Sequence, residues 1–107
     1  MWTIKYYSEQ VEQEVLDLPP GLLARYLRLT DLLIQFGANL GMPHTRAMGD
    51  RLFELRVKGS EGIARIFYCT LVGQRIVILH SFVKKTQKTP QKELKLARQR
   101  LWEVNGK

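Results

Sequence analysis

The segment RIVILHSFVKKTQKTP, residues 75–90, combines an apolar run, a basic cluster and the start of a helix. Residues 76–79 are all β-branched or aliphatic, a pattern that is typical of a strand buried on both faces. We therefore predict that this strand lies at the centre of a sheet. The chain then passes through a histidine and a phenylalanine before it reaches the lysines.

Lysines follow this strand at the point where it leaves the core. We expect the side chains of Lys84, Lys85 and Lys88 to project from the rigid end of this strand. Most short charge runs are only solvated surface, so these lysines indicate a site only if neighbouring strands add charge. Thr89 is a suitable N-cap and Pro90 a suitable first residue for a helix over residues 89–104.

The two preceding segments predict strands that pair with this one. Residues 51–58 alternate, and their polar side chains share one face: Glu54, Arg56 and Lys58. The sequence GSEG, residues 59–62, predicts a turn into an antiparallel strand over residues 63–71. A second turn at residues 72–74 completes a three-stranded meander. Arg65 interrupts the apolar series of the middle strand, where an arginine needs a partner or solvent.

The first half of the chain predicts one strand and two helices. Residues 2–6 alternate as in a half-buried strand, and Ser8 is a plausible N-cap for a short helix that Pro19-Pro20-Gly21 ends. Residues 22–36 carry the apolar stripe of a long core helix, followed by Gly37 as its C′ residue. Residues 38–50 read as a connecting loop. His44 lies in that loop, and we assign it no role.

Composition indicates a single globular domain over residues 1–107. Hydrophobic residues make up 45% and charged residues 25%, the usual balance for a soluble domain. No apolar stretch approaches the roughly 20 residues of a membrane helix, and no signal peptide is visible. We therefore expect a cytoplasmic protein. The lone Cys69 has no partner for a disulfide or zinc site and is interpreted as a core residue.

Charge is distributed unevenly along the chain. The net charge is +7, yet residues 1–50 hold four basic residues against six acidic ones, and residues 51–107 hold thirteen against four. Such a basic half points to a polyanionic partner. Nucleic acid is the first candidate, an acidic protein the second and an anionic membrane surface the third.

Several kinds of catalytic site have no sequence signature here. The chain has no glycine-rich phosphate loop, no histidines at metal-ligand spacing, no exposed paired carboxylates and no serine elbow. We therefore predict no metal and no cofactor.

The residues that converge are basic. Arg56, Lys58 and Arg65 could grip a phosphodiester and stabilise charge as a 2′-hydroxyl attacks it, which is metal-free RNA cleavage. Candidates to complete the site are Tyr68, His80, Lys84 and Lys85, with Lys88 as a further RNA contact. His80 is the obvious titrating group, although a packed strand histidine explains it equally well. A core position explains Tyr68 better than base stacking does.

Three segments carry a resemblance to a known family: LFELRV (52–57), GIARIFY (62–68) and ILHSFVKKTQKTPQKE (78–93). In this order and spacing they resemble the HigB branch of the RelE/ParE superfamily of bacterial and phage toxins. The resemblance extends from about Trp2 to Leu101. It implies an α+β fold with two N-terminal helices on a twisted antiparallel sheet and a C-terminal helix.

The resemblance also implies an activity and partners. RelE-like toxins cleave messenger RNA in the ribosomal A site and are neutralised by a cognate antitoxin that usually carries a helix-turn-helix domain. Their basic strand positions correspond to Arg56 and Lys58, their middle-strand arginine to Arg65, and the basic position after the last strand to Lys84 or Lys85. The C-terminal tyrosine of RelE has no counterpart, which gives His80 more weight. We predict that Arg65→Ala folds normally but loses at least ~10²-fold in cleavage rate, the scale of one lost charge-stabilising donor.

Two other functions are compatible with the same sequence. ParE-like toxins share the fold but poison DNA gyrase, and a non-catalytic nucleic-acid-binding domain would need only the charge. The fold class does not separate these functions, so the site has to be argued from its residues.

Overall fold

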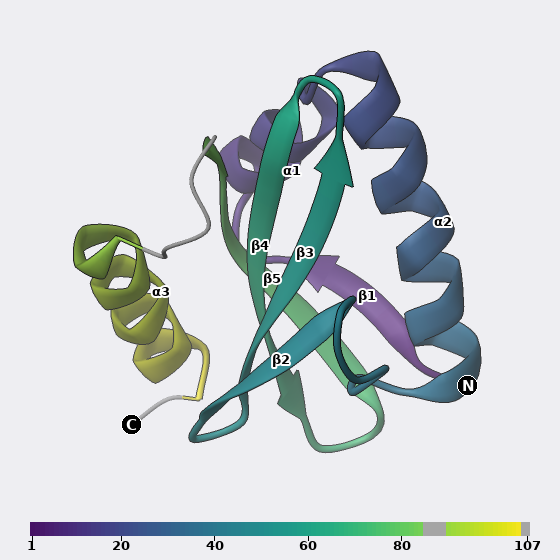
Figure 1. The fold of residues 1–107 in the computed structure, drawn as a ribbon. Coiled ribbons are helices and arrows are strands. Elements are labelled where there is room, and N and C mark those ends of the chain that lie inside the picture. Colours follow the sequence, from purple (N-terminus) through teal and green to yellow (C-terminus); the bar gives the residue numbers. More distant parts are fainter. Residues whose placement is uncertain (85–89, 106–107) are drawn as a thin grey trace.

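The chain forms an α+β fold, seen in a computed structural model that describes residues 1–84 and 90–105 (Figure 1). Of Lys84, only the backbone is described. The elements in chain order are β1 (Thr3–Tyr6), α1 (Glu9–Leu16), α2 (Pro20–Phe36), β2 (Thr45–Gly49), β3 (Leu52–Gly59), β4 (Gly62–Leu71), β5 (Arg75–Lys84) and α3 (Gln91–Val104). Two N-terminal helices, a five-stranded sheet and a C-terminal helix give the RelE-like arrangement that the sequence predicted.

The strand order in the sheet is β1-β5-β4-β3-β2. The meander of β3, β4 and β5 is antiparallel as predicted, whereas β1 pairs with β5 in parallel, so the sheet is mixed. The prediction that the strand over residues 76–79 is central is wrong, because β4 occupies the middle position. Residues 76–79 are nevertheless buried and paired on both sides, since β5 lies between β1 and β4.

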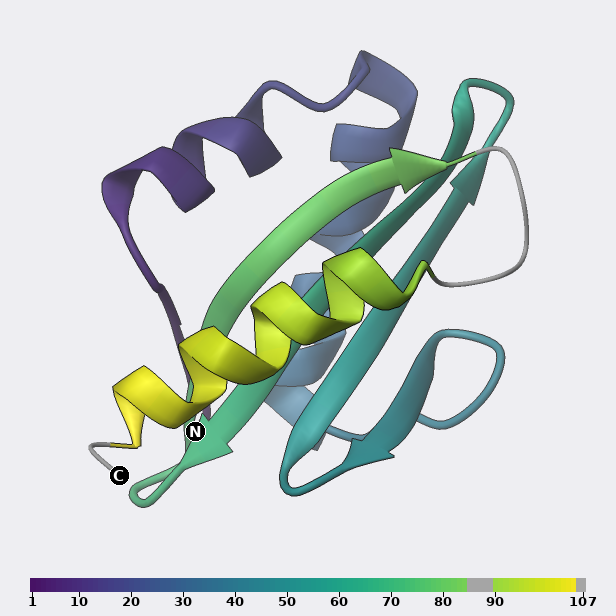
Figure 2. The same ribbon diagram turned by 90° about the vertical axis from the view of Figure 1, so that its left-hand side faces the viewer.

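Helices cover both faces of the sheet. The α1 and α2 helices lie on one face and α3 on the other, as Figure 2 shows with α3 in front. The first face carries the larger core, which includes Leu22 and Leu33 of α2 against Leu55 and Ile66 of the sheet. On the second face, here called the α3 face, Ala97 and Leu101 of α3 pack over Leu52, Phe67 and Leu79.

The helix boundaries follow local signals in the sequence. Ser8 caps α1 as predicted, because its hydroxyl accepts a hydrogen bond from the Val11 amide at 3.2 Å. Pro20 begins α2, two residues before the predicted start, and Gly37 follows its last turn with a φ of 103° that favours glycine. Pro90 is the N-cap residue of α3 rather than its first helical residue. The predicted N-cap, Thr89, lies outside the described residues.

Two features of the sheet were not predicted. The segment read as a loop over residues 38–50 contains β2, which pairs antiparallel with β3. In β5 the register shifts, so that Phe67 lies opposite His80 while Tyr68 lies opposite Ile78. This β-bulge places an extra residue in β5 and moves His80 onto the α3 face, away from Ile78.

No helix within the described residues is long and apolar enough to cross a membrane.

Candidate functional site

Four charged side chains gather on the α3 face of β3 and β4. We call them the basic cluster: Glu54, Arg56, Lys58 and Arg65. Arg56 and Arg65 lie directly opposite each other across the two strands, and Lys58 lies opposite Ile63. Residues that face each other in a ladder share a face of the sheet, so strict alternation in β3 brings the three polar residues of that strand together.

Two members of this cluster are buried, Arg65 and Glu54, and their side chains form an ion pair. Arg65 Nη1 lies 3.3 Å from Glu54 Oε2, and the two side chains are 2% and 0% exposed. Burying one charge alone would cost several kcal/mol, and the partner offsets that cost. The pair therefore fixes a positive charge below the surface. This buried ion pair argues against the expectation that Arg65→Ala folds normally, because the substitution would remove one of the groups that face Glu54 in the interior.

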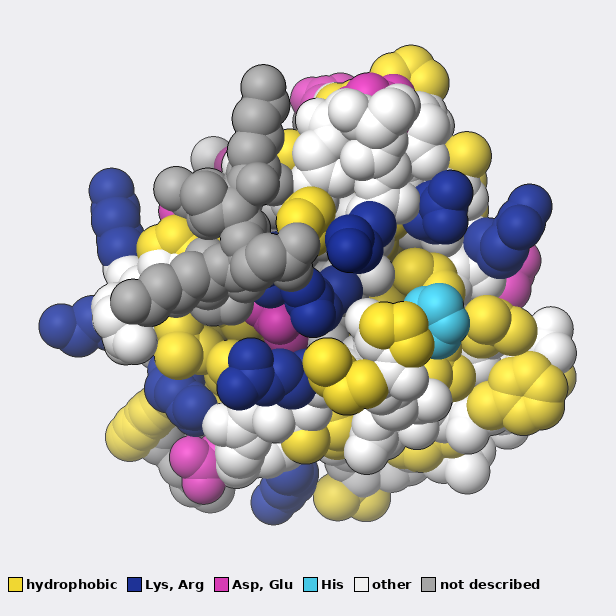
Figure 3. Space-filling view, viewed as in Figure 1, with side chains coloured by type: hydrophobic (Ala, Val, Ile, Leu, Met, Phe, Trp, Pro, Cys, Tyr) yellow, Lys and Arg dark blue, Asp and Glu magenta, His cyan; other side chains and the backbone are white. Residues whose placement is uncertain are grey.

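The more accessible members of the cluster are Arg56 and Lys58. Arg56 is half-buried and Lys58 is exposed. The Arg56 backbone is held in place because its amide donates a hydrogen bond to the His44 carbonyl at 2.9 Å. Figure 3 shows Lys and Arg side chains gathered over this region beside an acidic side chain. Together the four residues of the cluster carry three positive charges and one negative charge, a balance that attracts anions.

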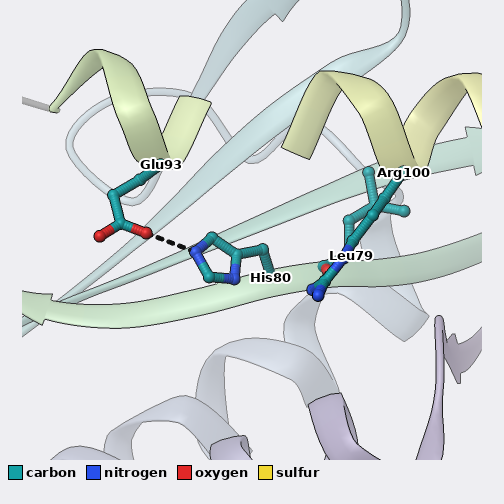
Figure 4. A network of polar contacts seen from close by, with 4 residues as sticks. All are labelled: Leu79, His80, Glu93 and Arg100. Carbon is teal, nitrogen blue, oxygen red and sulfur yellow. Dashed lines mark hydrogen bonds and ion pairs between the residues drawn. The ribbon is translucent and has the colours of Figure 1, made fainter. Parts of the chain in front are cut away.

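His80 lies on the same face of the sheet and contacts α3. Its Nε2 is 2.6 Å from Glu93 Oε1, and its ring stacks on Phe82 at a centroid distance of 5.8 Å. Figure 4 shows Glu93 reaching down from α3 to the imidazole. Its Nδ1 is buried and has no hydrogen-bond partner among the described residues. The histidine is thus both packed and paired with a carboxylate, an arrangement that orients an imidazole.

Arg100 anchors α3 close to His80. Its Nη1 donates a hydrogen bond to the Leu79 carbonyl at 2.8 Å, on the bulged part of β5. Figure 4 shows Arg100 and Leu79 on the side of His80 away from Glu93. The guanidinium carbon also lies 4.8 Å from the centre of the Tyr7 ring. The Tyr7 hydroxyl in turn donates to Glu103, and this hydrogen bond raises the Tyr7 pKa above its usual value. Helix α3 is therefore tied to the strand that carries His80.

Tyr68 does not join the basic cluster. It lies on the opposite face of the sheet, in the core beneath α1 and α2, where it is fully buried and stacks on Phe53. Its hydroxyl donates to the Ala38 carbonyl. Burial raises the Tyr68 pKa well above its usual value, so the hydroxyl stays protonated at neutral pH. The prediction that Tyr68 lies beside the basic residues is wrong, because successive residues of β4 point to opposite faces.

The remaining sequence candidates follow β5. Lys84 is the last residue of that strand, with its Cα opposite Ile63 in β4. The predicted roles of the Lys84 side chain, Lys85 and Lys88 fall outside the described residues. Cys69 is buried in the core of the α3 face as predicted, and burial raises its pKa to about 11. Its thiol is therefore a poor nucleophile at neutral pH.

Two partners of the predicted residues were missed from the sequence. Glu54 was recognised as part of a charged face but not as the partner of Arg65, although the alternation of β3 and the hairpin register place the two within reach. Glu93 has no comparable signal, since it lies 13 residues from His80. In their observed positions, these groups can hold an anion at the cluster and orient one imidazole beside it.

Comparison with known proteins identifies a family. Residues 13–102 match the sequence model of a family described as Phage derived protein Gp49-like (DUF891). The match includes every strand of the meander and most of α3. No curated protein matches the chain.

Proposed function

Since the chain belongs to the phage-derived Gp49-like family, we propose that it is the toxin of a type II toxin-antitoxin system and that it cleaves messenger RNA on the ribosome. The reaction is metal-free attack of a 2′-hydroxyl on the adjacent phosphodiester: the 2′-oxygen loses its proton and bonds to phosphorus, the P–O5′ bond breaks, and the departing 5′-oxygen takes up a proton, leaving a 2′,3′-cyclic phosphate. The RelE-like arrangement of helices and sheet and the resemblance of residues 52–93 to HigB toxins support this reading.

The observation that carries the proposal is the direct pairing of Arg56 with Arg65 across β3 and β4. Two guanidinium groups thus lie on neighbouring strands of one face, which they share with a single acid of the cluster, Glu54. With Lys58 on the same face, the cluster keeps a net positive charge on a rigid surface. A net positive charge held on a rigid surface is favourable for binding a phosphate.

Each basic side chain has a proposed role in the reaction. Arg56 and Lys58 contact the phosphate and the neighbouring backbone of the RNA. Arg65 adds a fixed charge from below, which stabilises the negative charge that builds on the phosphate during attack. On the sequence alone, Lys84 and Lys85 remain proposed contributors at the scissile phosphate, and Lys88 a proposed RNA contact.

His80 is the proposed group that moves a proton. Glu93 accepts a hydrogen bond from the ring and so fixes which nitrogen carries the hydrogen. A positive imidazole formed during the reaction would be stabilised by the same carboxylate. For direct proton transfer, His80 must come within hydrogen-bond reach of the RNA, which requires the Glu93 contact or the ring to shift when RNA binds.

A charge-matched pair of variants tests the role of the cluster. Arg56→Gln/Lys58→Gln removes the two accessible cations, and Arg25→Gln/Arg28→Gln removes two exposed cations from α2, which lies on the other face. Cleavage of a defined message by each protein is measured with purified translating ribosomes. We expect the first variant to lose at least ~10²-fold in rate and the second to stay near wild type. Equal losses, or none, would contradict the proposal.

A further inference from the structure

A second basic site lies at the other end of the α3 face. A pocket of about 660 Å³ opens where the β2–β3 turn, the β4–β5 turn and the last turns of α3 meet. Its volume is within the range of pockets that hold small organic ligands. None of the residues discussed for cleavage lines it.

Three arginines, one from each of these elements, line the pocket: Arg51, Arg75 and Arg98. Arg98 is held in place by a 2.7 Å hydrogen bond to the Met48 carbonyl, and it lies 3.5 Å from Asp50. Arg75 is held by a 2.8 Å hydrogen bond from its Nε to the Val72 carbonyl. Asp50 is the one acid among the described residues that line the pocket. The charge balance therefore favours an anionic occupant.

The β2–β3 turn holds its arginine in an unusual conformation. Asp50 and Arg51 both have positive φ, 58° and 67°, as a two-residue primed hairpin turn requires. Asn-Gly is favoured in such turns, and a long side chain at the second position is strained. Strain of this kind gathers at binding sites, and here it places a guanidinium at the rim of the pocket.

The pocket also offers an aromatic surface over an apolar floor. Trp102 is 49% exposed, although it is the largest side chain of α3. Leu71 and Leu101 line the same pocket. An exposed indole beside arginines is the combination that proteins use to stack a nucleobase and neutralise its phosphate.

We propose that this pocket binds one nucleotide of single-stranded RNA, with the base against Trp102 and the phosphate held by Arg75 and Arg51. The proposal rests on the proposed RNA cleavage, because the nucleotide is taken to belong to the strand held at the basic cluster. Arg51 and Arg56 are five positions apart along the chain, a span of about 17 Å in a strand. A few nucleotides of single-stranded RNA bridge that distance. The pocket would then set the path of the message on one side of the cut.

Fluorescence of Trp102 tests this site directly. The chain has two tryptophans, so Trp2→Phe leaves Trp102 as the reporter, and the full-length protein is titrated with a short single-stranded RNA. We expect saturable quenching. With Trp2 retained, Trp102→Leu should weaken RNA binding by ~5- to 100-fold, the scale of one stacked base. Phe36→Leu removes another exposed aromatic, 72% exposed at the end of α2, and should leave binding unchanged.

The salt dependence tests the phosphate contact. Arg75→Gln should weaken binding and lower the slope of log affinity against log salt by ~0.7, as expected for one lost contact to a single strand. RNA binding by Trp102→Leu equal to wild type would overturn the proposal. Quenching by a polyglutamate peptide but not by RNA would overturn it in favour of an acidic protein partner.

These experiments distinguish a failure of the pocket proposal from a failure of the cleavage proposal. If wild-type protein cuts message on ribosomes while the pocket variants bind RNA normally, the pocket assignment alone is lost. If RNA quenches Trp102 but no message is cut, the pocket remains an RNA site and the cleavage proposal is lost.

Discussion

The Arg65 side chain is one of the largest fully buried side chains in the described part of the chain. An arginine can be buried at this position because Glu54 on the neighbouring strand, β3, supplies an opposite charge at 3.3 Å. The same pairing holds the guanidinium in one orientation. Under the proposed mechanism, Arg65 therefore couples the binding of RNA to the stability of the core.

Arg65→Ala should destabilise the fold by about 3–5 kcal/mol, because Glu54 loses its charged partner in the core. The double variant Arg65→Met/Glu54→Leu should recover much of this loss, since it removes both charges and keeps the volume. Urea denaturation measures both. A single variant as stable as wild type would mean that the pair contributes nothing to folding.

His80 and Glu93 should act as a unit in cleavage. His80→Gln should lower the rate by ~10²- to 10⁴-fold if the imidazole transfers a proton. Glu93→Gln should lower it as well, and the double variant should be no worse than His80→Gln, because residues that act together are not additive. Single-turnover cleavage on ribosomes measures these rates.

The stability of the His80→Gln variant distinguishes a role of His80 in proton transfer from simple packing. A packed histidine would make His80→Gln lose stability first and activity only in proportion to the unfolded fraction. Additive losses in the double variant would likewise remove Glu93 from any role in orienting His80.

At the level of elements, the meander was predictable from residues 51–80, because strict alternation and short turns fix local pairing. The strand β2 was not, since Thr45–Gly49 carries little apolar alternation and pairs along an edge. Parallel pairing of β1 with β5 joins segments far apart in sequence, which no local pattern specifies. The bulge in β5 had the largest effect on the site, because a one-residue shift changes the face on which every later side chain lies.

The positions of the candidate site residues were predictable only where they follow from the alternation of side chains along a strand. Arg56, Lys58 and Arg65 share a face because of their positions in β3 and β4. Tyr68 was predicted on the wrong face because it is close to Arg65 in sequence. The two residues are three positions apart in β4, so their side chains point to opposite faces of the sheet. The contact of Glu93 with His80 depends on how α3 packs, which is a tertiary property.

The packing of α3 should depend on Arg100. Arg100→Met removes the hydrogen bond to the Leu79 carbonyl and the contact with the Tyr7 ring, which together should cost about 1–3 kcal/mol. Amide hydrogen exchange in α3 should rise accordingly. Lys95→Met, an exposed position on the same helix, should leave exchange unchanged. Similar exchange in both variants would show that the apolar contacts of α3 suffice.

For the whole molecule, we propose that the basic cluster is one surface that serves two polyanions. RNA and an acidic segment of an antitoxin would compete for the basic cluster, and a bound antitoxin would exclude RNA directly. Binding of such a segment should weaken as salt increases. We propose a cognate antitoxin with a helix-turn-helix domain as the natural partner, on the strength of the resemblance to HigB toxins.

Hydrogen exchange on the complex should show protection of β3 and β4 around Arg56 and Arg65. Arg56→Gln/Lys58→Gln should weaken antitoxin binding, with an effect that shrinks as salt rises. Protection confined to α2 would contradict a shared surface, and inhibition would then have to act by excluding the toxin from the ribosome.

Cleavage of messenger RNA on the ribosome is the central claim, and primer extension on a defined message tests it most directly. The wild-type protein is added to purified ribosomes translating that message, and the same message without ribosomes serves as the control. We expect new 5′ ends in phase with codons, formed only when ribosomes are present and without added metal beyond what translation requires. An intact message on active ribosomes, with DNA gyrase inhibited by the same protein, would contradict it.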